Sequence, residues 1–179
     1  FQVLAEQYAD SQLGILSRYY LGLIARQTKR VDEGKEHLSW VINNADELET
    51  RNLARNALAQ IVLGENNPEE AATLFEKILE EPSPNYPPQI ILMGLAQSYE
   101  KAGNEKRYSK TVEQSQQVAN ALWRQWQTDG NPETQALLAW YYCLVSTHPQ
   151  RLTLKHISEP TTPQRIGCER VGVEKNTSG

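Results

Sequence analysis

The side chains best suited to acid–base chemistry in this sequence are one histidine and two nearby glutamates. Glu33, Glu36 and His37 lie three or four residues apart, so a helix would bring them to one part of its surface. A catalytic site needs such groups to converge on a pocket with a nucleophile or further supporting residues, and the sequence supplies none convincingly. Glutamates at this spacing are typical of a solvated helix face. We therefore interpret His37 as an exposed histidine and predict that the chain is not an enzyme.

Metal and cofactor sites are also not expected. Two thiols and two imidazoles occur toward the end of the chain, at Cys143, His148, His156 and Cys168. Zinc sites usually show closely spaced ligand pairs such as C-x-x-C or H-x-x-x-H, and these four residues form no such pair. No glycine-rich loop follows a predicted strand, which excludes the common nucleotide-binding motifs. We predict no metal and no cofactor.

Charge and hydropathy exclude two further classes of partner. The 179 residues carry a formal net charge of −4, and the longest basic cluster is Lys29-Arg30. Proteins that bind nucleic acid usually show a basic face or stripe, so we expect no nucleic-acid partner. A membrane-spanning helix needs about 20 apolar residues, and no run in this sequence approaches that length. We expect no direct membrane insertion.

The elements that must position any functional residues belong to an internal repeat. Corresponding residues recur at a constant offset of 37, which lies in the range of helix–turn–helix solenoids. The recurring sets are Leu21, Leu58 and Leu95; Gly22, Ala59 and Ala96; Ala25, Val62 and Tyr99; Gly34, Ala71 and Tyr108; and Leu38, Phe75 and Val112. We expect the small residues to lie where two helices of a pair come closest, with the leucines beside them. Tyr108 departs from this pattern because it replaces a small residue.

Each period divides into two amphipathic helices. Apolar residues from Leu53 to Val62 recur at helical spacing, and residues 64–67 end that helix. Asn67 is suited to cap the next helix, and Pro68 suits its first position. By the same reasoning, helices are predicted near residues 1–8, 12–28, 32–44, 50–63, 68–80, 88–102, 105–127 and 132–146. The helix over 105–127 is predicted to cover one end of the array.

These motifs resemble the tetratricopeptide repeat (TPR) family. Leu95-Ala96-x-x-Tyr99 followed by Gly103 is similar to the first helix of a TPR and its turn, and Ala71-x-x-x-Phe75 followed by Pro82 is similar to the second. The common TPR period is about 34 residues, so we assign the additional residues to linkers at 43–50 and 81–88. The resemblance implies an all-α fold, a right-handed superhelix of antiparallel helix pairs. We expect this domain to cover residues 1–147, with pairs near 12–44, 50–80 and 88–127 and a terminal helix at 132–146.

The first eleven residues carry a finer resemblance. Phe1-x-x-Leu4-x-x-x-Tyr8-x-Asp10-Ser11 is similar to a junction between repeats in bacterial cell-envelope TPR proteins, although Ala9 stands where those proteins prefer proline. The resemblance implies that a repeat precedes Phe1 and favours the periplasm or cell envelope over the cytoplasm. Residues 148–179 lack helical periodicity, and we interpret them as an irregular or disordered tail. A segment foreign to the fold is the alternative for this tail.

The resemblance also implies a binding surface. In TPR arrays the first helices of successive pairs line a concave groove. The residues that correspond to groove positions are Tyr19, Leu23, Arg26, Asn56, Gln60, Leu63, Met93, Gln97 and Glu100. Several of these, Leu23 and Leu63 above all, are alternatively residues that pack against neighbouring helices. No cluster of lysine, arginine and asparagine that would clamp a terminal carboxylate is present at these positions.

We therefore expect a non-catalytic scaffold that binds a peptide or a partner helix in the groove, in a bacterial cell-envelope assembly. The alternative is a regulatory TPR segment of a larger enzyme or signalling protein. Self-association is a third possibility that the sequence leaves open.

Overall fold

The computed structural model describes residues 1–83 and 87–131, and every regular element in this part of the chain is an α-helix. Its helices are α1 (Gln2–Gln7), α2 (Gln12–Gln27), α3 (Val31–Asn44), α4 (Leu48–Gly64), α5 (Pro68–Glu80), α6 (Pro88–Lys101) and α7 (Glu105–Asp129). The predicted all-α helical-repeat fold is confirmed, and each observed boundary lies within two residues of the predicted one. The expected terminal helix at 132–146 and the tail at 148–179 lie outside the described residues.

The chain divides into two compact units, Phe1–Ser115 and Gln116–Gly179, and the boundary falls within α7. The first unit holds α1 to α6 and the beginning of α7, and it contains every predicted groove residue. In the described part of the second unit, the Trp123 and Trp126 rings lie on α7 with their centroids 5.1 Å apart. The expectation that α7 covers one end of the array stays a prediction.

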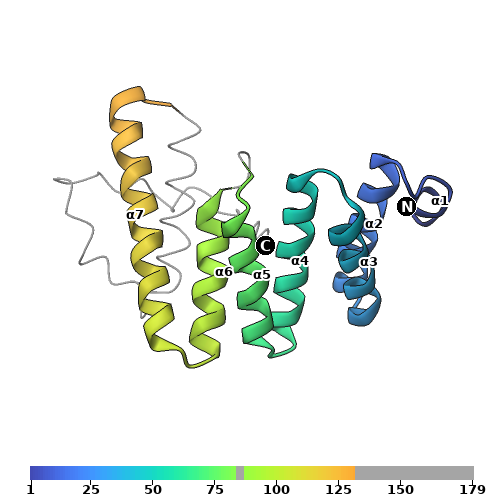
Figure 1. Cartoon of the computed structure of the whole chain (residues 1–179), viewed down its shortest axis with the longest axis horizontal. Coiled ribbons are helices and arrows are strands. Elements are labelled where there is room, and N and C mark those ends of the chain that lie inside the picture. Colours follow the sequence, from blue (N-terminus) through green and yellow to red (C-terminus); the bar gives the residue numbers. More distant parts are fainter. Residues whose placement is uncertain (84–86, 132–179) are drawn as a thin grey trace, which may run out of the picture. The chain divides into compact units, whose positions relative to one another are not determined.

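Helices of the first unit stand side by side in sequence order (Figure 1). α2 contacts α3, α3 contacts α4, α4 contacts α5, and α5 contacts α6, as in a stack of helix pairs. Buried side chains from these helices form one hydrophobic core. Leu38, Val41 and Phe75 are fully enclosed in it, so the apolar stripe of each helix faces its neighbours.

The small residues of the repeat lie at close helix contacts in the first two pairs. A Cβ atom added at Gly22 would lie 2.7 Å from Leu38 Cγ, which leaves no room for a side chain between α2 and α3. Ala59 and Ala71, the corresponding residues of α4 and α5, have no exposed surface. In the third pair Ala96 keeps some exposed surface, and Tyr108 packs half-buried against the core. Glycine lies two residues earlier there, because a Cβ at Gly94 would be 2.4 Å from the Phe75 ring.

Two local expectations need correction. Asn67 does precede α5, and Pro68 does open it, but the Asn67 side chain makes no capping hydrogen bond. Side-chain caps occur instead at α2, where Ser11 Oγ accepts a hydrogen bond from Gly14 N at 3.2 Å, and at α7, where Asn104 Oδ1 accepts one from Arg107 N at 3.2 Å. The linker expected at 43–50 is also shorter than predicted, because α3 continues to Asn44 and α4 begins at Leu48. Part of the additional length of the second repeat therefore lies in its first helix, α4, which is longer than predicted.

Candidate binding surface on the first helices

The predicted groove residues all lie on the first helices of the three pairs. We call this set the first-helix face: Tyr19, Leu23 and Arg26 on α2, Asn56 and Gln60 on α4, and Met93, Gln97 and Glu100 on α6. The offset of 37 places Tyr19, Asn56 and Met93 at one equivalent position. It likewise relates Leu23, Gln60 and Gln97. Equivalent positions on stacked helices form rows, so this face runs across successive repeats.

Tyr19 and Arg26 mark the α2 part of this face. Tyr19 is half-buried against the core, and its ring meets the Tyr20 ring edge-on at 5.5 Å between centroids. Burial and the neighbouring Tyr20 raise the pKa of the Tyr19 hydroxyl, while Arg26 opposes the shift. The hydroxyl therefore keeps its proton near neutral pH and can donate a hydrogen bond. Arg26 is exposed about two helical turns further along α2.

The α4 part of the face offers two amides. Asn56 and Gln60 are both partly exposed and lie one helical turn apart. Asn56 Oδ1 is buried without a hydrogen-bond partner among the described residues. A buried acceptor without a partner costs free energy, so a donor such as a peptide N–H would stabilise it. Leu63, the next groove position on α4, is buried in the core and unavailable.

The α6 part of the face, like the α2 part, has one exposed and two partly exposed residues. Gln97 is exposed, while Met93 and Glu100 are partly exposed. Leu23 of α2, by contrast, packs against the core with only part of its surface free. The structure thus separates the predicted set into accessible residues, such as Arg26 and Gln97, and residues that also serve helix packing. Binding by any of them stays a prediction.

A polar cluster that the sequence did not reveal joins the second and third pairs. The Tyr99 hydroxyl of α6 donates a hydrogen bond to Glu76 of α5. Arg107, at the start of α7, lies 3.5 Å from the same carboxylate and places its guanidinium 5.5 Å from the Tyr99 ring centre. The repeat pattern assigned Tyr99 to packing only, because spacing along a chain does not show which carboxylate its hydroxyl will meet.

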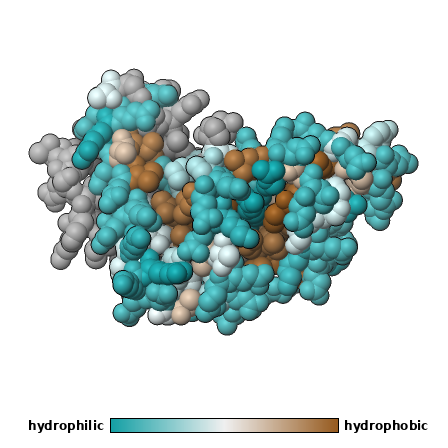
Figure 2. All heavy atoms as spheres, viewed as in Figure 1, coloured by the Kyte–Doolittle hydropathy of each residue, from teal (hydrophilic) through white to brown (hydrophobic). Residues whose placement is uncertain are grey.

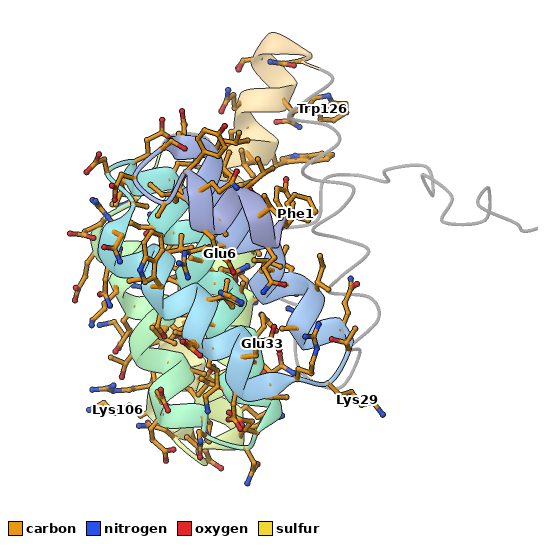
Figure 3. All side chains as sticks on the ribbon, turned by 90° about the vertical axis from the view of Figure 1, so that its right-hand side faces the viewer. Phe1, Glu6, Lys29, Glu33, Lys106 and Trp126 are labelled. Atoms are coloured by element: carbon orange, nitrogen blue, oxygen red, sulfur yellow. The ribbon has the colours of Figure 1, made fainter. Side chains whose placement is uncertain are left out.

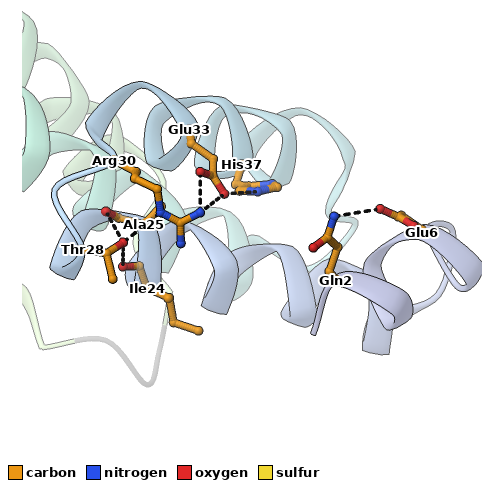
Figure 4. Close-up of polar contacts among 8 residues, drawn as sticks. All are labelled: Gln2, Glu6, Ile24, Ala25, Thr28, Arg30, Glu33 and His37. Carbon is orange, nitrogen blue, oxygen red and sulfur yellow. Dashed lines mark hydrogen bonds and ion pairs between the residues drawn. The ribbon is translucent and has the colours of Figure 1, made fainter.

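The histidine considered first for catalysis is less exposed than predicted. His37 is half-buried, and its Nε2 lies 3.8 Å from Glu33 Oε1 (Figure 4). Glu33 is itself held by Arg30, whose Nη1 lies 2.8 Å from its second carboxylate oxygen. This arrangement is a surface ion pair beside a histidine in the first turns of α3, which is typical of a solvated helix surface. Within residues 1–83 and 87–131, no group of histidine, cysteine, aspartate and glutamate side chains is arranged to hold a metal.

The surface combines hydrophilic and hydrophobic areas. Figure 2 shows hydrophobic residues gathered in patches between helices and bordered by hydrophilic ones. Among the described residues, no helix is both long enough and apolar enough to cross a membrane.

Helix pairs in contact, repeated at a constant offset with small residues between them, define an α-helical repeat protein. The family comparison agrees: residues 1–83 match the model of the tetratricopeptide repeat-like domain. Residues 1–83 are therefore similar to a TPR-like domain, as the motifs of this chain indicated. No curated protein and no solved structure matches the sequence.

Proposed function

We propose that this chain is a non-catalytic interaction scaffold that binds a peptide or a partner helix on its first-helix face. The TPR-like domain indicates a protein-interaction module, since such domains typically bind proteins. The observation that carries the finer proposal is the chemistry along equivalent positions of three helices: a protonated tyrosine, three amides, a methionine and an exposed arginine. Tyrosine and arginine are frequent binding hot spots, and methionine adapts to varied shapes.

The mixture favours a peptide with exposed backbone groups over a purely apolar ligand. Asn56 and Gln97 can each both donate and accept hydrogen bonds, which suits the alternating N–H and C=O groups of an extended chain. Asn56 Oδ1 is buried and lacks a partner among the described residues, so turning this amide outward toward a peptide would break no hydrogen bond of that oxygen. Arg26 at one end supplies a positive charge for an acidic side chain.

The test uses peptides selected from a phage-displayed random library against the intact chain. Selected peptides should lose at least tenfold in affinity for the Tyr19→Glu and Gln97→Glu variants. The matched control is Thr73→Glu, which adds the same charge at an exposed position of a second helix, α5. Unchanged affinity for both first-helix variants, or an equal loss in the Thr73 variant, would show that this face is not the binding surface.

The cell-envelope location indicated by the opening motif is part of the same proposal. Reading the coding sequence upstream of Phe1 tests it directly. A secretion signal or lipoprotein signal supports an envelope scaffold, whereas a catalytic domain supports a regulatory role in a larger enzyme.

A further inference from the structure

A cation stacked on an indole ring lies between the two helices of the first pair. The guanidinium carbon of Arg18, on α2, is 4.3 Å from the centre of the Trp40 ring, on α3. Trp40 is partly buried against the hydrophobic core, so its ring is held in place beneath the charge. Figure 3 looks onto this part of the array, where Lys29 lies in the turn that joins α2 to α3.

The Arg18 guanidinium lacks an acceptor for its N–H groups. Arg18 Nε is buried and has no hydrogen-bond partner among the described residues. None of the ion pairs between described residues includes Arg18. The carboxylate of Glu47, which follows α3, instead accepts a hydrogen bond from Gln12 at 2.7 Å. A buried cationic donor without an acceptor costs free energy, so a bound anion would stabilise it.

The second helix pair shows which groups satisfy the equivalent arginine. The offset of 37 relates Arg18 to Arg55 of α4. Arg55 Nη1 donates to Asn52 Oδ1 at 2.9 Å and lies 2.8 Å from Glu81 Oε2. The arginine of the second pair is therefore satisfied within the chain by an amide oxygen and a carboxylate.

Both of these acceptors are replaced in the first pair. The offset of 37 relates Asn52 to Ile15, which is buried and has no polar side-chain atom. It relates Glu81 to Asn44, whose side-chain amide donates to Trp40 O at 2.7 Å. Ring stacking leaves the edge of a guanidinium free to form two parallel hydrogen bonds with a carboxylate. The first pair thus keeps the cation of the second pair without its carboxylate.

We propose that Arg18 and Trp40 form a binding site for an acidic side chain of a partner protein. The partner's carboxylate takes the place beside Arg18 that Glu81 occupies beside Arg55, and Trp40 covers the face of the guanidinium. A carboxylate is favoured over a phosphate because the equivalent arginine of this chain is paired with a glutamate. The site goes beyond the proposed function, because Arg18 points about 100° around α2 from its neighbour Tyr19 and is not part of the first-helix face.

NMR spectroscopy of the intact chain tests this site with a small probe. The probe is N-acetylglutamate N-methylamide, whose only charge is its side-chain carboxylate. It should shift the Arg18 Nε–H and Trp40 Nε1–H resonances saturably, with a dissociation constant of about 1–10 mM for a ligand of this size. The glutamine analogue lacks the charge and should bind about tenfold more weakly or worse.

Two variants of equal charge separate this site from general electrostatic attraction. Asn44→Glu puts a carboxylate at the position equivalent to Glu81, so it should engage Arg18 and weaken probe binding about tenfold or more. Asn43→Glu adds the same charge at the neighbouring exposed position and should leave the affinity within about twofold. Arg18→Lys keeps the charge without the planar fork and should also weaken binding. Thermal melting checks that all three variants are folded.

Three results would overturn the proposal. The first is the absence of a saturable shift at Arg18 in the millimolar range. The second is an equal loss of affinity in Asn44→Glu and Asn43→Glu, which would show that the probe responds only to net charge. The third is tighter binding of inorganic phosphate, or of N-acetylalanine with its chain-end carboxylate, than of the glutamate probe. These titrations use neither selected peptides nor first-helix variants, so their failure is distinguishable from failure of the proposed peptide binding.

Discussion

Lys29 and Gly103 adopt the same left-handed backbone conformation two repeats apart, with φ of 61° and 69°. Asn66, between them in the repeat, has φ of 66°. The residue that follows each of these three donates its N–H to a carbonyl oxygen near the end of the preceding helix. In the first turn, Arg30 N lies 2.8 Å from Ala25 O. This hydrogen bond closes the end of a helix in the manner of a Schellman motif. The three turns are thus structurally equivalent, although only one uses glycine and Lys29 is the least suited of the three residue types to this conformation.

The first prediction is that Lys29→Gly stabilises the protein by about 0.5–1 kcal/mol. The left-handed region costs a residue other than glycine roughly 1–2 kcal/mol, so glycine relieves this strain. Part of the gain is offset, because glycine loses more chain entropy on folding. Lys29 is exposed, and its neighbours Thr28 and Arg30 keep the turn through their own bonds (Figure 4). Urea unfolding measures the change. Gln27→Gly, at the end of α2, should instead lower the free energy of unfolding by about 0.5–1 kcal/mol. A lower free energy of unfolding in both variants would contradict the left-handed conformation of Lys29.

A second prediction concerns the contact between α2 and α3. Gly22→Ala should destabilise the protein by about 1–3 kcal/mol, because the new methyl group would lie 2.7 Å from Leu38 Cγ. Gly64→Ala is the matched control, since a Cβ there meets nothing within 4 Å. That control should be neutral or slightly stabilising, because alanine is the better helix former. Equal unfolding midpoints for the two variants would mean that α2 and α3 do not approach closely at Gly22.

The helices were predictable because their information is local and periodic. Apolar spacing fixed α4 and α5, and Pro68 marked the start of α5 to the residue. The small residue Gly22 also indicated its close contact in advance, because a fixed offset of 37 relates it to Ala59. Placing the candidate residues on the first helices needed no more than this register and the family resemblance.

Contacts between distant residues could not be predicted in this way. Asn52 reaches a main-chain carbonyl 29 residues away, and Tyr99 meets a glutamate 23 residues away. Neither pair has a spacing that recurs in the repeat. Burial differs among groove positions for the same reason, because Leu63 is enclosed by helices whose approach depends on side chains elsewhere.

A third prediction follows from the buried Tyr99 hydroxyl. Burial, and then its hydrogen bond to Glu76, raise the pKa of Tyr99 above the ordinary 10.0. As pH rises, the unfolded tyrosine loses its proton first, so the free energy of unfolding falls above about pH 10. One proton contributes a slope of up to about 1.4 kcal/mol per pH unit. Tyr99→Phe should be less stable at pH 7 but should lose stability less steeply between pH 10 and 11. Tyr8→Phe, at an exposed position, should lose stability between pH 10 and 11 as steeply as the unchanged protein does. An equally steep loss in Tyr99→Phe would contradict the role given to the Tyr99 hydroxyl.

The fourth prediction concerns the buried amide that joins α4 to the end of α5. Asn52 has no exposed surface, and its Nδ2 donates to Glu81 O at 2.7 Å. Its Oδ1 accepts from Arg55 Nη1 at 2.9 Å. Asn52→Ala should therefore destabilise the protein by about 1–3 kcal/mol, because it leaves a helix-end carbonyl without its donor. Asn43→Ala, at an exposed position of α3, should cost less than about 0.5 kcal/mol.

The Asn52 bond goes to the main chain of Glu81, and this detail sharpens the test. Arg55 also pairs with the Glu81 carboxylate, at 2.8 Å, so the Asn52 effect has two routes. In a Glu81→Ala background the carboxylate is gone but the carbonyl stays. The cost of Asn52→Ala should then persist at nearly its original size in urea unfolding. Glu81→Ala removes only the carboxylate that Arg55 contacts. If the cost of Asn52→Ala disappears in this background, Asn52 acts by orienting Arg55 toward the carboxylate and not by capping α5.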